Sequence, residues 1–494
     1  MSPADLSYRR RQTWENHLGN QSVDPLRIYA PETIEEVSAI VREAEQAGAT
    51  VRAVGSGHSW SDVALTTGFL LETDRLARVP AGEPDFLRPE WSGRRLVRAE
   101  AGIRIHELNA HLDREGLALS NMGGYDHQTV AGVISTSTHG SGMGFGPLND
   151  FVHSLDLVAS GGDVYRIERD HGPTDPEAFA SHHGASRKLV QRNDFFDAAV
   201  VGMGCMGIVC TAMLEVEPAY FLREVRELHP WAKVRADLED GTVLRKNRHY
   251  EVLFSPYERK HAYPCLVTTR NRTDDPSRKW WSKRTRNWAV EALSAFPPTP
   301  AIINLIVYWW PSLSPMLLED AMRGLKKDEY DEVSYKVLNI GAANVLPAYS
   351  AEIGVPMDGR HIEAVERIIA IAAERRRLGD VYQSSPISFR FVRASPAHMS
   401  MMNGRDTMMI ELIQLTRSEG GYELLAAYEE ALHKLGGRPH WGQVNTLTGS
   451  HELIASMYPD YGKWLEVYGQ LNASRVFDSP FTRRVGISHE RFTA

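Results

Sequence analysis

The chain has 494 residues, and its 55 Lys and Arg against 63 Asp and Glu give a formal net charge of −8. This acidic balance argues against a general nucleic-acid-binding protein, which needs a basic surface. The length predicts two or three domains, since one hydrophobic core rarely grows beyond about 250–300 residues. Cys205, Cys210 and Cys265 are too few for a disulfide framework. Because no histidine stands beside them, we expect buried free thiols and no metal site.

The N-terminus carries basic residues but no apolar run behind them, so it does not resemble a secretory signal. The most apolar window, residues 301–318, is interrupted by polar residues and by two prolines. It therefore predicts interior packing rather than a membrane-spanning helix. Contact with a membrane surface and an apolar substrate pocket are the alternatives for this window. We expect a cytoplasmic monomer or homodimer with no transmembrane segment and no nucleic-acid partner.

The first half of the chain reads as short strand–helix–strand units. Residues 26–54 begin with an alternating strand, and Thr33 followed by Glu36 is the sequence of a capping box that opens a helix. Gly48 ends that helix, and a strand follows. A second unit of the same kind covers residues 96–120.

A β-hairpin follows at residues 155–167, where two glycines form the turn. Residues 207–216 predict a further strand, which Pro218 closes. Beyond it, strands alternate with longer helical stretches such as residues 359–377. This change in the pattern of strands and helices predicts a domain boundary near residue 219.

Two glycine-rich loops are the candidates for chemistry. The first, residues 54–61, follows a strand, and its two glycines can expose backbone N–H groups that cradle a pyrophosphate. It lacks the third glycine of the dinucleotide-binding fingerprint, and a simple tight turn explains it equally well. The second, residues 121–142, alternates glycines with small hydroxyl residues. A surface loop is its alternative reading, but two such loops in one half favour a large phosphate-bearing cofactor.

Five segments together resemble a known family: residues 14–20, 52–62, 130–142, 204–209 and 437–442. They are similar to the vanillyl-alcohol-oxidase-type (PCMH-type) flavoproteins, in the branch of the gulonolactone, arabinonolactone and alditol oxidases. The matches run in family order from the first to the last tenth of the chain. The middle third matches only loosely.

The resemblance implies an α+β protein with a two-lobed FAD-binding domain and an α+β cap domain. The cap would hold a mixed antiparallel sheet flanked by helices. The implied divisions are an N-terminal arm at 1–20, an FAD-binding domain at 21–219 with lobes at 21–90 and 91–219, a cap at 220–429, and a segment at 430–494 that returns to the FAD domain.

His58 occupies the family position that bonds covalently to the flavin, so the resemblance implies FAD attached through His58. Its alternative is a hydrogen-bonding role without the bond. Gly123 falls where the family controls oxygen access, and a small residue there favours an oxidase. The implied cofactor-binding residues are Val54, Gly55, Ser56, Gly57, His58, Ser59, Trp60, Gly123, Gly124, His127, Ala131, Gly132, Thr136, Ser137, Thr138, His139, Gly140, Gly207, Ile208 and His440.

At the implied substrate site, relatives carry a Glu-x-Arg pair and a Lys after His-Trp-Gly. Here Arg390 is kept, but Ser388 stands where Glu is expected and Gln443 where Lys is expected. A neutral Gln cannot stabilise an anionic reduced flavin as Lys does, and His440 and a helix dipole are the candidates for that role. Glu352 lies on a strand like a cap strand of the family. The catalytic candidates are Arg390, Gln443, His440, Ser388 and Glu352.

The proton acceptor stays open, because Glu352, Tyr125, Asp126 and His127 are all candidates and the sequence contains no distances. The resemblance implies an oxidase that transfers hydride from a CH–OH group to flavin N5 and passes the electrons to oxygen, giving hydrogen peroxide. The expected substrate is a polyol, sugar or aldonolactone. The alternatives are a dehydrogenase with another electron acceptor, an oxidase of a bulkier alcohol suggested by Trp309 and Trp310, and a flavin-binding protein without turnover.

Overall fold

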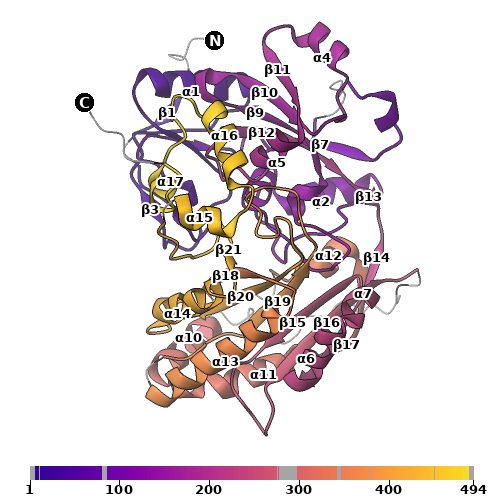
Figure 1. Ribbon diagram of the computed structural model, residues 1–494, viewed down its shortest axis with the longest axis vertical. Helices are drawn as coiled ribbons and strands as arrows, with labels where there is room; N and C mark the ends of the chain where they lie inside the picture. Colours follow the sequence, from indigo (N-terminus) through magenta and orange to yellow (C-terminus); the bar gives the residue numbers. More distant parts are fainter. Residues whose placement is uncertain are drawn as a thin grey trace.

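A computed structural model of the chain describes residues 6–10, 12–80, 86–274, 276, 298–341, 347–379, 381–449 and 451–488. Figure 1 shows two parts stacked along the long axis, with both ends of the chain at the upper part. The upper part holds the N-terminal sheets and the C-terminal helices, and the lower part holds one large sheet with its helices. The predicted α+β class is confirmed.

The first lobe is a four-stranded sheet. Its order is β1 (Tyr8–Arg9), β4 (Arg27–Tyr29), β6 (Phe69–Glu72) and β5 (Val51–Val54). Helix α1 (Ile34–Gln46) connects β4 to β5, and the Thr33 side chain accepts a hydrogen bond from the Glu36 N–H at 3.2 Å, as the predicted capping sequence requires. Both β4 and β5 pair in parallel with β6. The first glycine loop therefore leaves the carboxyl end of a parallel strand.

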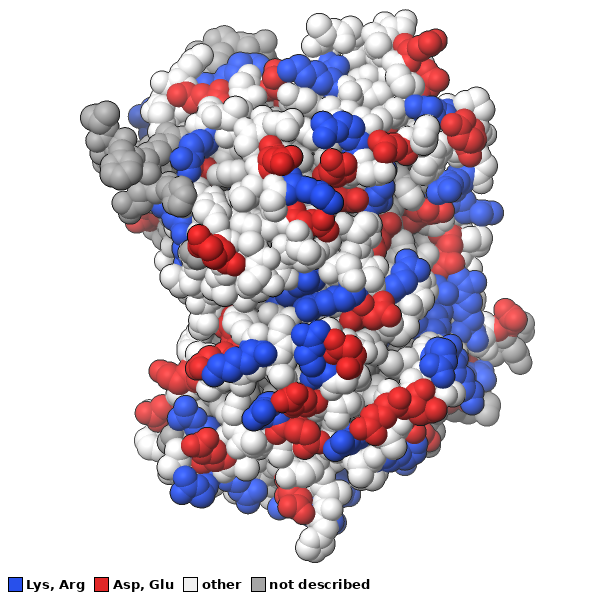
Figure 2. Space-filling view, in the orientation of Figure 1, with Lys and Arg blue, Asp and Glu red and all other residues white. Residues whose placement is uncertain are grey.

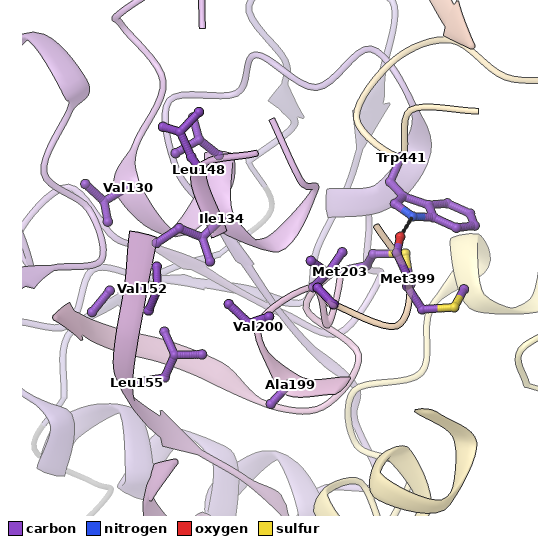
Figure 3. Packing of buried hydrophobic residues seen from close by; sticks show 14 of the residues in the cluster. Val130, Ile134, Leu148, Val152, Leu155, Ala199, Val200, Met203, Met399 and Trp441 are labelled. Atoms are coloured by element: carbon purple, nitrogen blue, oxygen red, sulfur yellow. Dashed lines mark hydrogen bonds between the residues drawn. The ribbon is translucent and has the colours of Figure 1, made fainter. Parts of the chain in front are cut away.

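The second lobe is a five-stranded sheet. Its order is β11 (Arg187–Gln191), β10 (Val164–Glu168), β9 (Val152–Val158), β12 (Ile208–Glu215) and β7 (Leu96–Glu100). Strands β9 and β10 are the predicted hairpin, paired antiparallel. Helix α3 (Val130–Ser135) packs against β12, and Figure 3 shows its residues Val130 and Ile134 near Val152 and Leu155 of β9.

The lower part is built on an eight-stranded sheet in which every described neighbouring pair is antiparallel. Its order is β17 (Lys327–Val333), β14 (Phe221–Pro230), β16 (Pro264–Arg272), β15 (His249–Phe254), β19 (Ile387–Val392), β20 (Thr407–Leu415), β18 (Ala348–Pro356) and β21 (Arg438–Pro439). Helices α6 (Trp231–Asp240), α13 (Arg360–Leu378) and α14 (Gly421–His433) bury its apolar face.

Because side chains alternate along a strand, the other face of this sheet is polar. On β19 the apolar residues Phe389 and Phe391 face the helices, while Ser388 and Arg390 point to the opposite side. The same alternation puts Glu411 of β20 and Glu352 of β18 on the polar face. This face carries most of the candidate catalytic residues.

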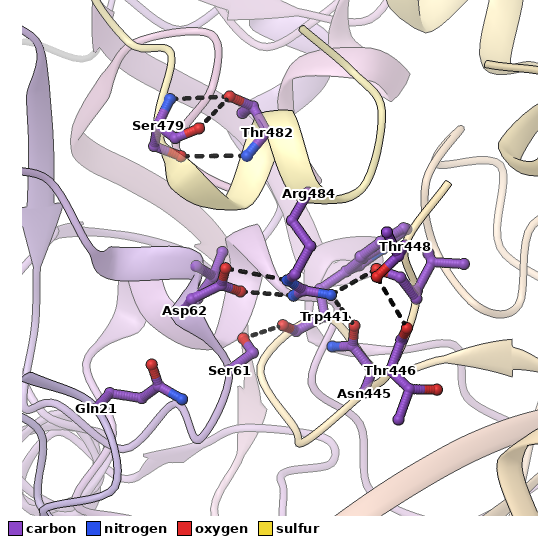
Figure 4. A network of polar contacts seen from close by, with 12 residues as sticks. Gln21, Ser61, Asp62, Trp441, Asn445, Thr446, Thr448, Ser479, Thr482 and Arg484 are labelled. Atoms are coloured by element: carbon purple, nitrogen blue, oxygen red, sulfur yellow. Dashed lines mark hydrogen bonds and ion pairs between the residues drawn. The ribbon is translucent and has the colours of Figure 1, made fainter. Parts of the chain in front are cut away.

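The C-terminal segment returns to the first lobe. The backbone N–H of Val51 donates to the carbonyl of Val476 at 2.7 Å, and Phe477 joins the apolar core under β5. Arg484, at the end of α17 (Pro480–Arg484), forms a two-pronged ion pair with Asp62 at 3.0 and 2.5 Å (Figure 4). The chain thus closes on the loop that follows β5.

The apolar window at 301–318 only partly fits the prediction of interior packing. It forms most of α10 (Pro298–Trp309) and the start of α11 (Ser314–Gly324), where Val307 and Leu318 are buried. Trp309 and Trp310, however, are 63% and 59% exposed. This exposure gives no support to the alternative that these tryptophans serve a bulkier alcohol substrate. Among the described residues, no helix combines the length and apolarity needed to cross a bilayer.

Charges are mixed on the surface. Figure 2 shows acidic and basic side chains interspersed over both parts of the molecule on the face in view. Cys205, Cys210 and Cys265 are buried and free, as predicted.

The second lobe contains a buried ion pair whose loss is measurable. Asp156 lies between Arg166 at 2.8 Å and Arg98 at 3.2 Å, and all three side chains are buried. Although burial disfavours the Asp156 carboxylate, the two arginines outweigh it and lower its pKa. Asp156→Asn removes the buried negative charge that both arginines contact, so we expect urea denaturation to show a free energy of unfolding lower by about 3–5 kcal/mol.

The control is Asp163→Asn, which breaks the exposed pair with Lys188. That change should cost no more than about 1 kcal/mol. Equal effects of the two variants would contradict the assignment.

Candidate active site

A cleft opens between the two lobes of the upper part. The first lobe contributes the loop after β5, and the second contributes the start of α3 and the start of β12. The C-terminal segment adds His440 and Gln443. The predicted cofactor-binding residues that line this cleft are Val54, Gly55, Ser56, Gly57, His58, Ser59, Ala131, Gly132, Thr136, Gly207, Ile208 and His440.

The loop after β5 presents a row of free hydrogen-bond donors. Within the described part of the chain, the backbone N–H groups of residues 55–59 donate to no other protein atom. Gly55 lies so close to Thr129, the N-cap of α3, that an added Cβ would meet its Oγ1 at 2.1 Å. The loop is thus pressed against the second lobe with its donors unsatisfied, which is the arrangement that binds phosphate oxygens.

A buried cation lies beside these donors. Arg52 lines the cleft and is 2% exposed. Its guanidinium donates to the carbonyls of Val63, Met203 at 2.7 Å and Phe477 at 3.5 Å. No carboxylate of the described residues forms an ion pair with it. Its remaining partner is the Cys205 Sγ at 3.7 Å, so the buried positive charge is held by neutral groups and favours an anionic ligand in this cleft.

His58 stands in a cluster of rings at the edge of the cleft. Its ring centroid lies 4.4 Å from that of His17 and 4.7 Å from that of Tyr125. Burial, together with the neighbouring His17, His127 and Arg104, lowers the pKa of His58 to about 4. The imidazole is therefore neutral at physiological pH and keeps a lone pair, as a nucleophile must.

Charged residues form a row across the polar face of the large sheet. Arg270 contacts Glu224 at 2.7 Å and Glu251 at 2.9 Å. Arg390 follows, but it lies 3.9 Å from Glu251 and 3.6 Å from Glu411, which is too far for tight ion pairs. Burial disfavours the Arg390 cation, yet Glu411, Glu251 and Glu352 outweigh it and raise its pKa. The guanidinium is charged and only loosely held by protein.

The pKa values of two buried carboxylates on this face are shifted in opposite directions. Burial and the negative charge of Glu352 raise the pKa of Glu411, and Arg390 offsets this only in part. Burial would also raise the pKa of Glu352, but His139, His440 and Arg390 outweigh it and lower the value. His139 Nε2 lies 3.2 Å from Glu352 Oε1. Carboxylates whose pKa values are pushed apart in this way are typical of acid–base sites.

Gln443 connects the cleft to this face. The Ser350 hydroxyl lies 2.6 Å from Gln443 Oε1 and 3.2 Å from Glu411 Oε1. His440 accepts a hydrogen bond at Nδ1 from the Gly442 N–H at 3.1 Å, so the neutral ring carries its proton on Nε2. Burial is the main cause that lowers the pKa of His440 to about 4. A neutral His440 cannot replace the charge of the missing lysine.

Eight predicted cofactor-binding residues are not on the cleft wall: Trp60, Gly123, Gly124, His127, Ser137, Thr138, His139 and Gly140. Trp60 donates its N–H to the Gly442 carbonyl at 2.7 Å, and Ser137 bonds Asn149 at 2.9 Å, so both hold the walls in place. Gly124 lies against Arg390, since an added Cβ would be 3.3 Å from its Nη2. The second glycine loop thus adjoins the polar face.

Four residues of the site were not predicted from the sequence: Arg52, Glu251, Ser350 and Glu411. Glu411 is the register partner of Ser388 on the neighbouring strand, and both side chains point to the polar face. A carboxylate is therefore present one strand away from the position where the family motif has it. The available signal was a single Glu inside the otherwise uncharged strand β20.

Comparisons with known proteins agree with this geometry. The family described as D-arabinono-1,4-lactone oxidase matches residues 212–485, and an FAD binding domain matches residues 25–168. An L-gulono-1,4-lactone dehydrogenase of Mycobacterium tuberculosis is 28% identical over 96% of this chain and 98% of its own. An L-gulonolactone oxidase of Mus musculus is 24% identical over 96% of this chain and 97% of its own.

Among solved structures, a solvent-stable cholesterol oxidase superposes with a TM-score of 0.78 at 16% identity, covering 98% of this chain and 99% of its own. At that identity the likeness concerns the fold. The donor loop and Arg52 fit the pyrophosphate of FAD, and His58 lines the same cleft.

Proposed function

Because the chain belongs to the D-arabinono-1,4-lactone oxidase family, we propose that it is an FAD-dependent oxidoreductase that oxidises a CH–OH group. The observation that carries the proposal is the set of Arg390, Glu411 and Glu352 on a polar sheet face. This set is joined to the cofactor cleft through Ser350 and Gln443.

FAD supplies the hydride acceptor when it is bound. Arg390, charged and only loosely paired, binds and orients an oxygen of the substrate. Glu411 takes the hydroxyl proton, since its raised pKa suits a general base better than the lowered pKa of Glu352 does. Glu352 stays ionised and holds His139 in place beside His440.

We propose an aldonolactone, sugar or polyol as the substrate. On the polar sheet face, hydrogen bonds to several hydroxyl groups are available from Arg390, Glu251, Glu411 and Ser388. The same buried charges oppose an apolar sterol, because they would lose solvation without gaining partners. The curated relatives are named for aldonolactones.

Oxygen is the proposed electron acceptor, with hydrogen peroxide as the product. Gly123 supports this proposal, since an added Cβ would lie only 3.2 Å from Thr138 Cγ2 and would crowd the second glycine loop. A dehydrogenase with another acceptor is the second candidate, and it is favoured by the name of the mycobacterial relative.

The test is an anaerobic panel of aldonolactones, sugars, polyols and sterols, followed by air. We expect an aldonolactone or polyol to bleach the flavin absorbance because the enzyme takes up hydride. Air should then restore the flavin absorbance at least as fast as the substrate reduced it. Bleaching without rapid recovery would indicate the dehydrogenase, and no bleaching by any compound would refute catalysis.

We further propose that His58 holds the flavin covalently. Its neutral imidazole and its place on the cleft wall support this bond. Acid-precipitated wild-type protein should stay yellow, whereas His58→Ala should release its flavin to the supernatant. The control is His153→Ala, a histidine paired with Glu215 away from the cleft, which should keep the colour. Release of flavin from the wild type would disprove the bond.

Glu411→Gln tests the proton acceptor. We expect the rate of anaerobic flavin reduction to fall by about 10²–10⁴-fold, as for loss of a general base. In the wild type the rate should rise with pH through the raised pKa of Glu411, because the ionised form accepts the proton. The variant should lack that rise.

The control is Glu227→Gln on β14, whose carboxylate is mostly exposed and faces His229. It should retain the wild-type rate and pH profile. A Glu411→Gln enzyme with an unchanged rate and pH profile would exclude Glu411 as the base.

A further inference from the structure

Three metal-binding side chains meet beside the second glycine loop. His106 lies at the start of α2 (Ile105–Arg114), and Asp126 and His127 lie on the loop. Each offers one ligand atom, and these atoms lie within 4.8 Å of one another. None of the three belongs to the cleft wall.

The His106 ring is held in place through one of its two nitrogens. Its Nδ1 lies 3.1 Å from the backbone oxygen of Asp126, and its own backbone N–H donates to the same oxygen at 2.9 Å. The ring proton is therefore on Nδ1, and the lone pair of Nε2 remains available. A histidine held through its other nitrogen in this way is the usual arrangement in metal sites.

Asp126 and His127 complete the set. Asp126 is buried, and its Oδ2 accepts a hydrogen bond from Asn339 at 2.5 Å. Its Oδ1 lies 3.8 Å from His127 Nε2, which is too long for a hydrogen bond. Two ligands of one tetrahedral zinc ion stand about 3.3 Å apart, so a small movement suffices. The His127 side chain is 54% exposed and can make it.

We propose that His106, Asp126 and His127 bind one divalent transition-metal ion of the zinc class, with water as the remaining ligand. Two imidazoles and one carboxylate suit Zn²⁺, Co²⁺ or Ni²⁺, whereas Mg²⁺ and Ca²⁺ prefer oxygen alone. This site goes beyond the proposed redox function and does not depend on it. It also departs from the expectation that the chain has no metal site, which rested on its cysteines.

The site gives the ion a route to influence the cofactor. The His127 ring stacks on Tyr125 with centroids 5.1 Å apart, and Tyr125 contacts His58 at 4.7 Å. A dication there adds positive charge near His58 and disfavours protonation of its imidazole.

Calorimetric titration of chelator-treated, flavin-loaded protein with Zn²⁺ tests the site. We expect about one ion bound per chain of the wild type. In His106→Gln and in His127→Gln the affinity for Zn²⁺ should fall by about tenfold or more. The His127 variant is the safeguard for folding, because its side chain is half exposed. His229→Gln, which alters a histidine facing a single carboxylate, should bind as the wild type does.

Absence of stoichiometric binding to the wild type would overturn the proposal. So would binding of equal strength in the wild type and both cluster variants, which would identify an adventitious ion only. Because the titration measures the heat of metal binding and not enzyme turnover, its result is independent of whether the chain oxidises any alcohol.

Discussion

The active site depends on the contact between the loop after β5 and residues 441–443. The N–H of Trp60 donates to the Gly442 carbonyl at 2.7 Å, and the Ser61 hydroxyl donates to the Trp441 carbonyl at 2.6 Å. Trp441 is in turn fixed by its Nε1 bond to the Met399 carbonyl at 2.7 Å (Figure 3). Since these segments come from opposite ends of the chain, the cofactor cleft forms only when both ends have folded together.

The large sheet supplies the second constraint. One face buries an apolar core against helices, and this core fixes the strand register. With the register fixed, Glu251 stands beside Arg390 and Glu411 stands beside Ser388 on the opposite face. A slip of one residue on β19 would turn Arg390 into the core, so packing far from the cleft sets the charge pattern beside it.

Local features of the site could be predicted from the sequence, and contacts made by pairing could not. The capping residues at 33–36 and the donor loop at 54–59 are short-range signals. The link between Ser388 and Glu411 depends on strand register, and the cluster of His106 and His127 depends on how α2 meets the glycine loop. Neither appears as a spacing along the chain. The exposure of Trp309 was missed because an apolar window does not state which side faces solvent. The domain limits near 219 and 430 stay predictions.

The pairing of Ser388 with Glu411 has a consequence for how enzymes of this kind change substrate. Neighbouring strands are about 4.8 Å apart, so a carboxylate that moves sideways by one strand keeps the charge of the site but shifts its centre. A substrate anchored on Arg390, as proposed above, would then present its reacting hydroxyl from a different carbon. In a sequence alignment such a change looks like the loss of a catalytic residue, whereas in space the carboxylate is only displaced by one strand. Substrate selectivity can therefore change while the chemistry is retained.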